Sequence, residues 1–408
     1  MSLRSDAELI ITRAIESALP DNAVRKALAE IKLKGEVYVV AVGKAAWQMG
    51  RTAYEVLGER IKKGIVITKH GYSRGEIGEM TVYEAGHPVP DADTYTATAA
   101  VLELAERLGE SDQLIFLLSG GGSALFEKPL IPEKDMERLT KELLGSGADI
   151  VEINTLRKRF SAVKGGRFAE KCAPARVYTV VLSDVIGDRL DMIASGPAYP
   201  DSSTCEQAEE IVRRYSITLT PLMQELIKKE TPKELNNVET YITGSVRELC
   251  ASAERTCREL GYEPMILTDS LCCTARDAGV FFSNIAQRYA ASGRKLAFIA
   301  GGETVVQLTG TGLGGRNQEI ALAAAEGIAG FENVCVFSVG SDGTDGPTDA
   351  AGGYADGNTK AALQKAGIEI FDVLRNNDAY HALDKVGGLI KIGATGTNVN
   401  DVSVLLIG

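Results

Sequence analysis

Three consecutive glycines between two serines are the residues of this chain most suited to ligand chemistry. They follow the uninterrupted apolar run 114–118, which predicts a strand buried on both faces. A glycine turn at the end of such a strand lets bare backbone N–H groups approach a ligand. The N-terminus of a following helix would favour an anion at the same point, although a merely flexible turn is the alternative. The predicted anion-binding segment comprises Ser119, Gly120, Gly121, Gly122 and Ser123.

A lysine occupies a similar junction earlier in the chain. The apolar run 36–43 predicts a buried strand that leads directly into Lys44 and then into a helix. The segment is not a P-loop, because Tyr38 and Ala45 stand where that motif needs a glycine and a hydroxyl residue. A lysine at a helix start opposes the helix dipole, and a bound anion would explain its presence there.

Positive charge is concentrated in residues 150–171, although the formal net charge of the chain is −11. We expect Asn154 to cap a helix here and Gly165–Gly166 to end it. Arg157 and Lys164 are seven residues apart and would then share one helix face. Such a run is either a solvated face or the lining of a cleft for an anionic ligand.

Carboxylates follow two other predicted strands. Asp184 and Asp188 come at the end of the segment 176–188, and Asp342 follows the apolar run of segment 334–353. Carboxylates at the carboxyl ends of parallel strands lie where α/β enzymes bind ligands and Mg²⁺. All three are therefore candidate metal ligands or candidates for orienting a substrate hydroxyl.

Two more glycine-rich joints lie in the C-terminal half of the chain. One follows a predicted strand at 295–300, and the other leads into a predicted helix that begins near Arg316. Arg316 joins Lys44 as a candidate for stabilising phosphoryl charge. The candidate nucleotide- or substrate-binding residues at these joints are Gly302, Glu303, Gly314, Gly315 and Asn317.

One pattern favours a different chemistry. Gly310, Gly312 and Gly315 match the dinucleotide-binding pattern G-x-G-x-x-G, which would indicate a nicotinamide-dependent reductase. The strand expected before the pattern, ETVVQL, alternates in polarity, unlike a central parallel strand, and the next strand-end acid, Asp342, comes later than usual. Phosphoryl transfer uses more of the unusual residues together, because it needs cations around the phosphoryl oxygens, a metal ion and in-line positioning.

The bulk composition narrows the class of protein. The chain has 408 residues, which predicts two or three domains. Its negative net charge argues against nucleic acid as a general partner. Seven cysteines without a CxxC pair indicate a reducing, cytoplasmic setting, and no uncharged run is long enough for a membrane span.

Strands and helices alternate through both halves, which predicts an α/β fold. Two helices are expected within residues 5–33, and Asp91 is expected to cap a helix over residues 92–108. A run rich in Lys, Glu, Thr and Pro near residue 235 marks a boundary. We therefore predict two domains, residues 1–235 and 236–408.

The motifs, in their order, resemble those of the glycerate 2-kinase family over nearly the whole chain, from about residue 5 to 405. The segments that carry the resemblance are VAVGKAA, AGHPVPD, LLSGGGSALF, INTLRKRFSAVKGGRFA, VLSDVIGD with ASGP, AGGETVVQLTGTGLGGRNQEIAL and SVGSDGTDGPTDAAGG. Residues from about 295 onward look like the leucine-rich C-terminal region of that family.

The resemblance implies transfer of the ATP γ-phosphoryl group to the 2-hydroxyl of D-glycerate, giving 2-phosphoglycerate and ADP, with Mg²⁺ or another divalent metal. It implies a Rossmann-like first domain with a parallel sheet, a smaller second α/β domain with a mixed sheet, and an active site in the cleft between them. Lys44 and Arg316 match the charged catalytic positions of the family. A homodimer is compatible with this assignment. Some members have been called hydroxypyruvate reductases, so an NAD(P)H-dependent hydroxypyruvate reductase is the alternative.

Overall fold

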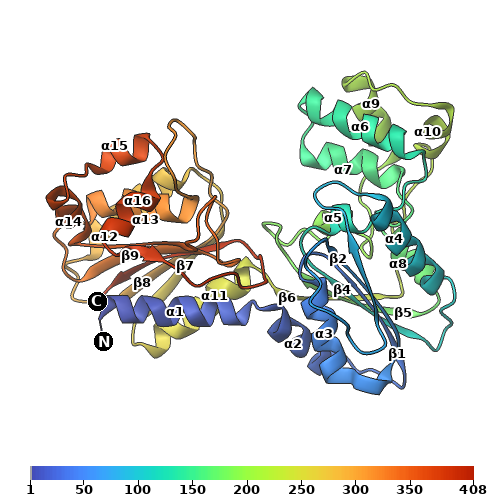
Figure 1. Cartoon of the computed structure of the whole chain (residues 1–408), viewed down its shortest axis with the longest axis horizontal. Helices are drawn as coiled ribbons and strands as arrows, with labels where there is room; N and C mark the ends of the chain where they lie inside the picture. The colour runs from blue at the N-terminus through green and yellow to red at the C-terminus, as the bar shows by residue number, and fades with distance from the viewer. Residues whose placement is uncertain (1) are drawn as a thin grey trace. The chain divides into compact units, whose positions relative to one another are not determined.

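A computed structural model describes residues 2–408 as two compact units (Figure 1). The Rossmann-like unit spans Ala23–Thr243, and the mixed-sheet unit combines the residues up to Asn22 with Gly244–Gly408. These units differ from the predicted division at residue 235 in two places. The first helix buries its apolar face in the mixed-sheet unit, and the strand Val238–Gly244 extends the first sheet beyond the predicted boundary.

The sheet of the Rossmann-like unit has the strand order β3-β2-β1-β4-β5-β6. The pairs β2–β3, β1–β2, β1–β4 and β4–β5 are parallel, as predicted for this domain. The order reverses between β1 and β4, and ligands of doubly wound sheets bind outside the carboxyl ends of the strands at such a point. The strands are β1 (Val37–Val42), β2 (Ile61–Lys69), β3 (Thr81–Ala85), β4 (Gln113–Leu118), β5 (Arg176–Leu182) and β6 (Val238–Gly244).

Burial on both faces explains the uninterrupted apolar run in β4. Leu114, Phe116 and Leu118 pack in one core with α4 (Ala92–Ala105) and α8 (Arg167–Cys172). Ile115 and Leu117 point to the opposite face, where they pack with α2 (Pro20–Glu30) and α3 (Ala46–Leu57). The strand end that carries the glycines is therefore fixed from both sides of the sheet.

Four of the remaining helices of this unit form a separate helical cluster. Helices α6, α7, α9 and α10 share a small apolar core of their own and lie together at the top of Figure 1. The remaining helices are η1 (Gly58–Arg60), α5 (Gly122–Leu125), α6 (Glu133–Ser146), α7 (Ile150–Arg159), η2 (Ile193–Ser195), α9 (Cys205–Arg214) and α10 (Pro221–Leu226).

The second sheet is mixed, as predicted, with the strand order β11-β10-β9-β12-β8-β7. Strands β7 and β8 pair in parallel, and the other neighbours pair antiparallel. The strands are β7 (Glu263–Leu271), β8 (Leu296–Gly302), β9 (Val334–Gly340), β10 (Gly352–Asp356), β11 (Leu389–Ile390) and β12 (Asp401–Ile407).

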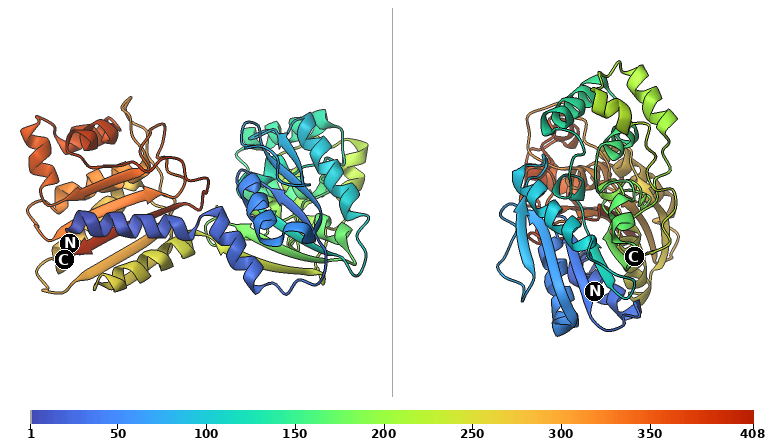
Figure 2. Two further views of the ribbon diagram at one scale, coloured as in Figure 1. Left: turned by 60° about the horizontal axis from the view of Figure 1, so that its bottom comes forward. Right: turned by 90° about the vertical axis from the view of Figure 1, so that its right-hand side faces the viewer.

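Helices cover both faces of the mixed sheet. Helices α1 and α11 lie along one face, and Figure 2 shows α1 extended beside the strands. The other five helices of the unit pack on the opposite face, where α13 makes the central layer of the core. The helices are α1 (Leu3–Ser17), α11 (Val246–Glu259), α12 (Ala275–Tyr289), α13 (Arg316–Gly327), α14 (Thr359–Lys365), α15 (Ile370–Arg375) and α16 (Ala379–Lys385).

Local predictions were wrong in two segments, the basic segment and residues 303–308. The helix in the basic segment begins at Ile150, because Asp149 and Glu152 form a capping box, so Asn154 lies inside the helix and does not cap it. That helix ends at Arg159, and Arg157 and Lys164 therefore do not share a helix face. The segment ETVVQL (303–308) forms no strand, because β8 already ends at Gly302.

Within residues 2–408, no helix combines the length and the apolar character needed to cross a bilayer.

Candidate active site

The loops that follow β1 and β4 are hydrogen-bonded to each other at the point where the strand order reverses. The Ser119 N–H donates to the last carbonyl of β1, and the Lys44 N–H donates to the Gly120 carbonyl, both at 2.9 Å. The Ser119 hydroxyl accepts from the Ala45 N–H at 3.1 Å. A Cβ on Gly43, where φ is +125°, would lie 2.2 Å from the Ser119 Oγ. Only glycine permits this approach, so the two loops are held as one rigid structure.

The predicted glycine loop, Ser119–Ser123, lies against groups that leave no room for side chains. A Cβ on Gly120 would lie 2.3 Å from the Asp184 Oδ2, and one on Gly122 would lie 2.7 Å from the Ala194 Cβ. The loop after β5 therefore brings the predicted metal ligand Asp184 to the glycine loop. The expected helix, α5, follows as a single turn of four residues.

Gly121 is enclosed by two groups that the sequence places far apart. Its φ of +87° is in the left-handed region, and a Cβ there would lie 3.2 Å from both the His87 Nε2 and the Lys44 Cγ. The imidazole and the lysine stem therefore lie over the same face of the loop. No described carboxylate pairs with the Lys44 ammonium, and no described residue hydrogen-bonds to the His87 ring.

The backbone of the glycine loop has donors without protein acceptors. Among residues 2–408, the N–H groups of Gly120, Gly121 and Gly122 make no hydrogen bond to the protein. Gly120 and Gly121 are partly exposed, and Gly122 is buried. Three unused N–H groups beside an unpaired ammonium form a site suited to an anion.

The predicted basic residues lie behind this loop. The Arg157 guanidinium donates to the Ser123 carbonyl at 3.1 Å, and the Lys164 ammonium donates to the same oxygen at 2.8 Å. Lys164 is fully buried, and its ammonium also lies 3.3 Å from the Glu127 carboxylate. Burial, reinforced by the Arg157 charge, lowers the pKa of Lys164 to about 8 even though Glu127 opposes the change. In this structure both side chains support the loop from its inner side.

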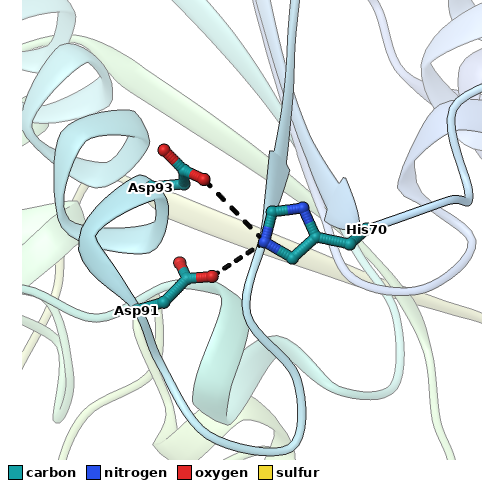
Figure 3. Close-up of side chains that lie close together, drawn as sticks. All are labelled: His70, Asp91 and Asp93. Carbon is teal, nitrogen blue, oxygen red and sulfur yellow. Dashed lines mark hydrogen bonds and ion pairs between the residues drawn. The ribbon is translucent and has the colours of Figure 1, made fainter.

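An ion pair anchors the loop that carries His87 (Figure 3). The His70 Nε2 lies 2.7 Å from the Asp91 Oδ2 and 3.9 Å from the Asp93 Oδ2. Asp91 also caps α4, as predicted, by accepting from the Thr94 N–H at 2.9 Å. Although burial alone would raise the pKa of Asp91, the bonds from His70 and Thr94 lower it to about 2. Residues 86–91 are thus tied to both β2 and α4.

Arg316 lies at the start of α13 in the mixed-sheet unit. Its guanidinium makes two bonds to the Asp401 carboxylate, at 2.6 and 3.1 Å, and one to Glu303 at 2.7 Å. Burial alone would lower the pKa of Arg316, but the bond and charge of Asp401, with the charge of Glu303, raise it above its ordinary value. A guanidinium has five N–H donors, so two remain for a ligand. Glu303 is held in turn by the Asn400 amide at 3.2 Å.

A buried carboxylate fixes the beginning of α13. The N–H groups of Asn317 and Gln318 donate to the Asp345 carboxylate at 3.1 and 2.8 Å. A Cβ on Gly315 would lie 2.2 Å from the Asp345 Cγ, so this glycine allows the cap to form. Burial raises the pKa of Asp345 to about 7, against the two N–H donors that lower it. Asn317 is itself buried and accepts from the Ser338 hydroxyl at 2.5 Å.

The other predicted residues of this unit are dispersed around the same strand ends. Gly302 has a φ of +152°, and a Cβ there would lie 2.3 Å from the Leu271 carbonyl oxygen. Gly314 packs near Ala379, and the Asp342 carboxylate accepts from the Thr344 N–H at 3.0 Å. Gly302 therefore serves the junction of β7 and β8, whereas Asp342 lies at the end of β9.

The three predicted metal ligands form no ready cluster. Asp184 and Asp188 belong to the Rossmann-like unit, and Asp342 belongs to the mixed-sheet unit. Among residues 2–408, the only three acidic, His or Cys groups with metal-like spacing are His70, Asp91 and Asp93. Those three residues already satisfy one another in the ion pair of Figure 3.

Sequence reasoning missed two residues of these sites, Asp401 and Asp345, which make the main contacts of Arg316 and α13. His87, in the segment AGHPVPD, was a candidate either for contacting a ligand or for ordering its loop, and it lies over Gly121. Asp401 opens an otherwise apolar strand, a signal that could have been noticed. Nothing in the spacing of Asp345 distinguishes it from the other acids of its loop.

The dinucleotide-binding pattern lacks its structural context. It should follow a strand directly, but residues 303–315 form only an isolated bridge between Val305 and Thr274. The N–H of Gly312 donates to the Asn376 carbonyl, and the Gly310 N–H donates to the Asn377 side chain. The N–H groups of these two glycines are therefore used within the protein and are not available to a dinucleotide phosphate. This argues against a nicotinamide-dependent reductase.

The chain matches two family models and is similar to several curated proteins over most of their length. The model described as "Domain of unknown function (DUF4147)" matches residues 6–228, and the MOFRL family model matches residues 296–401. A protein of Agrobacterium vitis, described only provisionally as a hydroxypyruvate reductase, is 36% identical over 92% of this chain and its own full length.

The stronger similarities are to glycerate kinases. A D-glycerate 2-kinase of Thermotoga maritima is 51% identical over 100% of this chain and 99% of its own length. A glycerate 2-kinase of Pyrococcus horikoshii is 39% identical over 100% of this chain and 98% of its own. The crystal structure of a Thermotoga maritima glycerate kinase superposes with a TM-score of 0.96, covering 100% of this chain and 99% of that one. On the identity, coverage and fold of these relatives, the chain belongs to the glycerate 2-kinase family.

Proposed function

We propose that the protein transfers the γ-phosphoryl group of ATP to the 2-hydroxyl of D-glycerate, giving 2-phosphoglycerate and ADP. The observation that carries the proposal is the set of unused N–H groups of Gly120, Gly121 and Gly122 beside the unpaired Lys44. Both substrates are anions, and the transferred group carries negative charge throughout the reaction. The names of the relatives, D-glycerate 2-kinase and glycerate 2-kinase, support the same reaction.

Lys44 and the glycine loop would hold an anion and stabilise charge during the transfer. Fixed donors around a phosphoryl group lower the barrier because they need no reorganisation during the reaction. The loop fits either the nucleotide phosphates or the glycerate carboxylate. Arg157 and Lys164 would contribute by fixing the Ser123 carbonyl, and so the loop, in place.

Arg316 would act in the same transfer step as Lys44. Asp401 and Glu303 fix the orientation of the planar guanidinium. The two N–H donors that remain for a ligand therefore have fixed directions. We propose that Glu303, Gly302, Gly314 and Gly315 contact the substrate or nucleotide near Arg316. We propose that Asn317 holds the start of α13 in place.

A divalent metal fits the Rossmann-like unit. The Asp184 carboxylate lies against Gly120, where a phosphate held by the loop N–H groups would be near it. Mg²⁺ commonly takes one or two protein carboxylates and completes its coordination with phosphate oxygens and water. We propose Asp184 as the main protein ligand, with Asp188 and Asp342 as weaker candidates. When bound, the metal would neutralise charge on the ATP phosphates.

The proposed setting is the cytoplasm. All seven cysteines are free, which is compatible with a reducing compartment. The formal net charge of −11 argues against a nucleic acid partner, and small anionic substrates would be held by local cations. A homodimer stays a prediction of the family resemblance.

The reaction is tested by product analysis. Purified protein incubated with D-glycerate, ATP and Mg²⁺ is expected to yield 2-phosphoglycerate, identified by NMR. A parallel sample with hydroxypyruvate and NADH or NADPH should keep its nicotinamide absorbance. Formation of 3-phosphoglycerate would contradict the proposed regiochemistry, and consumption of the nicotinamide alone would favour the reductase.

Removing either cation should slow the transfer. Lys44→Ala and Arg316→Ala are each expected to lower kcat by roughly tenfold to a thousandfold, because each removes charge stabilisation of the phosphoryl group. Lys63→Ala and Arg288→Ala, which change exposed residues of the same two units, serve as matched controls. A kcat within about threefold of wild type for Lys44→Ala or Arg316→Ala would contradict the assigned role.

Asp184→Asn should change the metal requirement. We expect the Mg²⁺ concentration for half-maximal activity to rise by about tenfold or more, because a neutral amide is a weaker Mg²⁺ ligand than a carboxylate. Asp384→Asn, an exposed change in the mixed-sheet unit, is the control. An unchanged Mg²⁺ titration for Asp184→Asn would exclude this carboxylate as the main ligand.

A further inference from the structure

The imidazole of His87 is a titratable group at the glycine loop that has no role in the proposed charge stabilisation. His87 follows β3 in the loop 86–91, and its imidazole lies over Gly121 beside the stem of Lys44. A Cβ on Gly121 would lie 3.1 Å from the His87 Cδ2 and 3.2 Å from its Nε2. The edge of the ring that carries Nε2 therefore faces the loop.

The ring is held in place without using its nitrogens. No described residue hydrogen-bonds to the His87 imidazole, in contrast to His70 and His381, which pair with Asp91 and Asp378. The loop is fixed on both sides of His87, because the Gly86 N–H donates to the Thr94 hydroxyl at 3.2 Å and Asp91 caps α4. Both ring nitrogens are thus left for a ligand or for water.

The surroundings favour the neutral imidazole. Burial lowers the pKa of His87 below its ordinary value, and the charges of Lys44 and Lys69 lower it further. These two lysines, from the ends of β1 and β2, are the charged groups that act on the ring. A neutral imidazole can accept a proton, whereas an imidazolium cannot.

We propose that His87 accepts the proton of the substrate hydroxyl during phosphoryl transfer, with Nε2 as the accepting atom. The inference rests on the proposed function. The hydroxyl oxygen forms a bond to the γ-phosphorus while the bond from that phosphorus to the β,γ-bridging oxygen breaks, and ADP leaves with the electron pair. The hydroxyl proton passes to His87 and then to solvent, so the products are the phosphorylated acid, ADP and one proton.

The geometry accommodates this role whichever anion the loop binds. The attacking hydroxyl and the γ-phosphoryl group are adjacent in the transfer, so a base beside either one is within reach of the proton. Lys44 on the same face of Gly121 would stabilise the phosphoryl oxygens, and its charge would keep the imidazole unprotonated before the reaction. The pair therefore separates two tasks, charge stabilisation and proton transfer.

The test compares His87→Asn with wild type in the full chain, with D-glycerate and MgATP as substrates. Asparagine retains hydrogen bonding but does not accept a proton at neutral pH. We expect kcat to fall by about a hundredfold or more, with KM for each substrate within about threefold of wild type. His381→Asn, an exposed change on α16, should keep the wild-type kcat.

The pH profile separates a base from a structural residue. In wild type, kcat/KM should fall as pH drops through the lowered pKa of His87, because the protonated ring cannot accept the proton. This acidic limb should be absent in His87→Asn and present in His381→Asn. A His87→Asn enzyme with kcat within threefold of wild type, or with the acidic limb intact and KM raised, would overturn the proposal.

A second measurement covers the case in which His87→Asn does not fold. The chain has three histidines, so the imidazole C–H signals of wild type can be assigned by NMR with His70→Gln and His381→Asn. The His87 signal should shift when D-glycerate and a non-hydrolysable ATP analogue are both added, and an unmoved signal would overturn the proposal. Failure of wild type to form any phosphorylated product would overturn the proposed function as well, whereas an active wild type with an active His87→Asn would overturn only the role of His87.

Discussion

The close approach of the loops after β1 and β4 is the constraint on which the rest of the Rossmann-like site depends. Ser119 and Gly43 meet at a distance that excludes any side chain on the glycine, and two backbone hydrogen bonds join the loops. This contact fixes the glycine loop, whose three glycine N–H groups make no hydrogen bond within residues 2–408. It also places Lys44 over Gly121, because the lysine follows the same β1 end. An anion site is thus built from backbone geometry, with one side chain supplying the charge.

The two proposed catalytic cations, Lys44 and Arg316, have different surroundings. Lys44 has no described carboxylate partner, so its charge is available to a ligand. Arg316 is tied to Asp401 and Glu303, which cancel much of its charge but fix its direction. The first arrangement favours attraction of an anion, and the second favours precise hydrogen bonding. Phosphoryl transfer needs both contributions.

Much of the fold could be predicted from the sequence, because its signals are local. The apolar runs before Lys44 and Ser119 identified buried strands, and their burial on both faces follows from the helices packed there. Asp91 was recognised as a helix cap from its position alone. The compact units could not be predicted in full, since α1 packs on a sheet whose strands come more than 200 residues later.

The site was predicted less completely, because its key contacts join distant segments. Asp401 meets Arg316, and His87 meets Gly121, through strand order that no local pattern reveals. The basic segment was misjudged for a related reason. Its charge predicted either a solvated face or the lining of a ligand cleft, but Lys164 turns inward to Glu127 and the Ser123 carbonyl. Burial of a charge with its partner cannot be read from the run of basic residues alone.

The most direct test of the central claim is to observe the glycine-loop amides themselves. Protein labelled with ¹³C and ¹⁵N would be titrated with D-glycerate and, separately, with a non-hydrolysable ATP analogue and Mg²⁺. The amide signals of Gly120, Gly121 and Gly122 would be assigned by triple-resonance NMR on the unsubstituted protein. The account predicts that at least one of the two ligands shifts these three amide signals as its anionic group accepts their N–H donors. If both ligands bind and the three signals stay in place, the glycine loop is not the anion site and the account is contradicted.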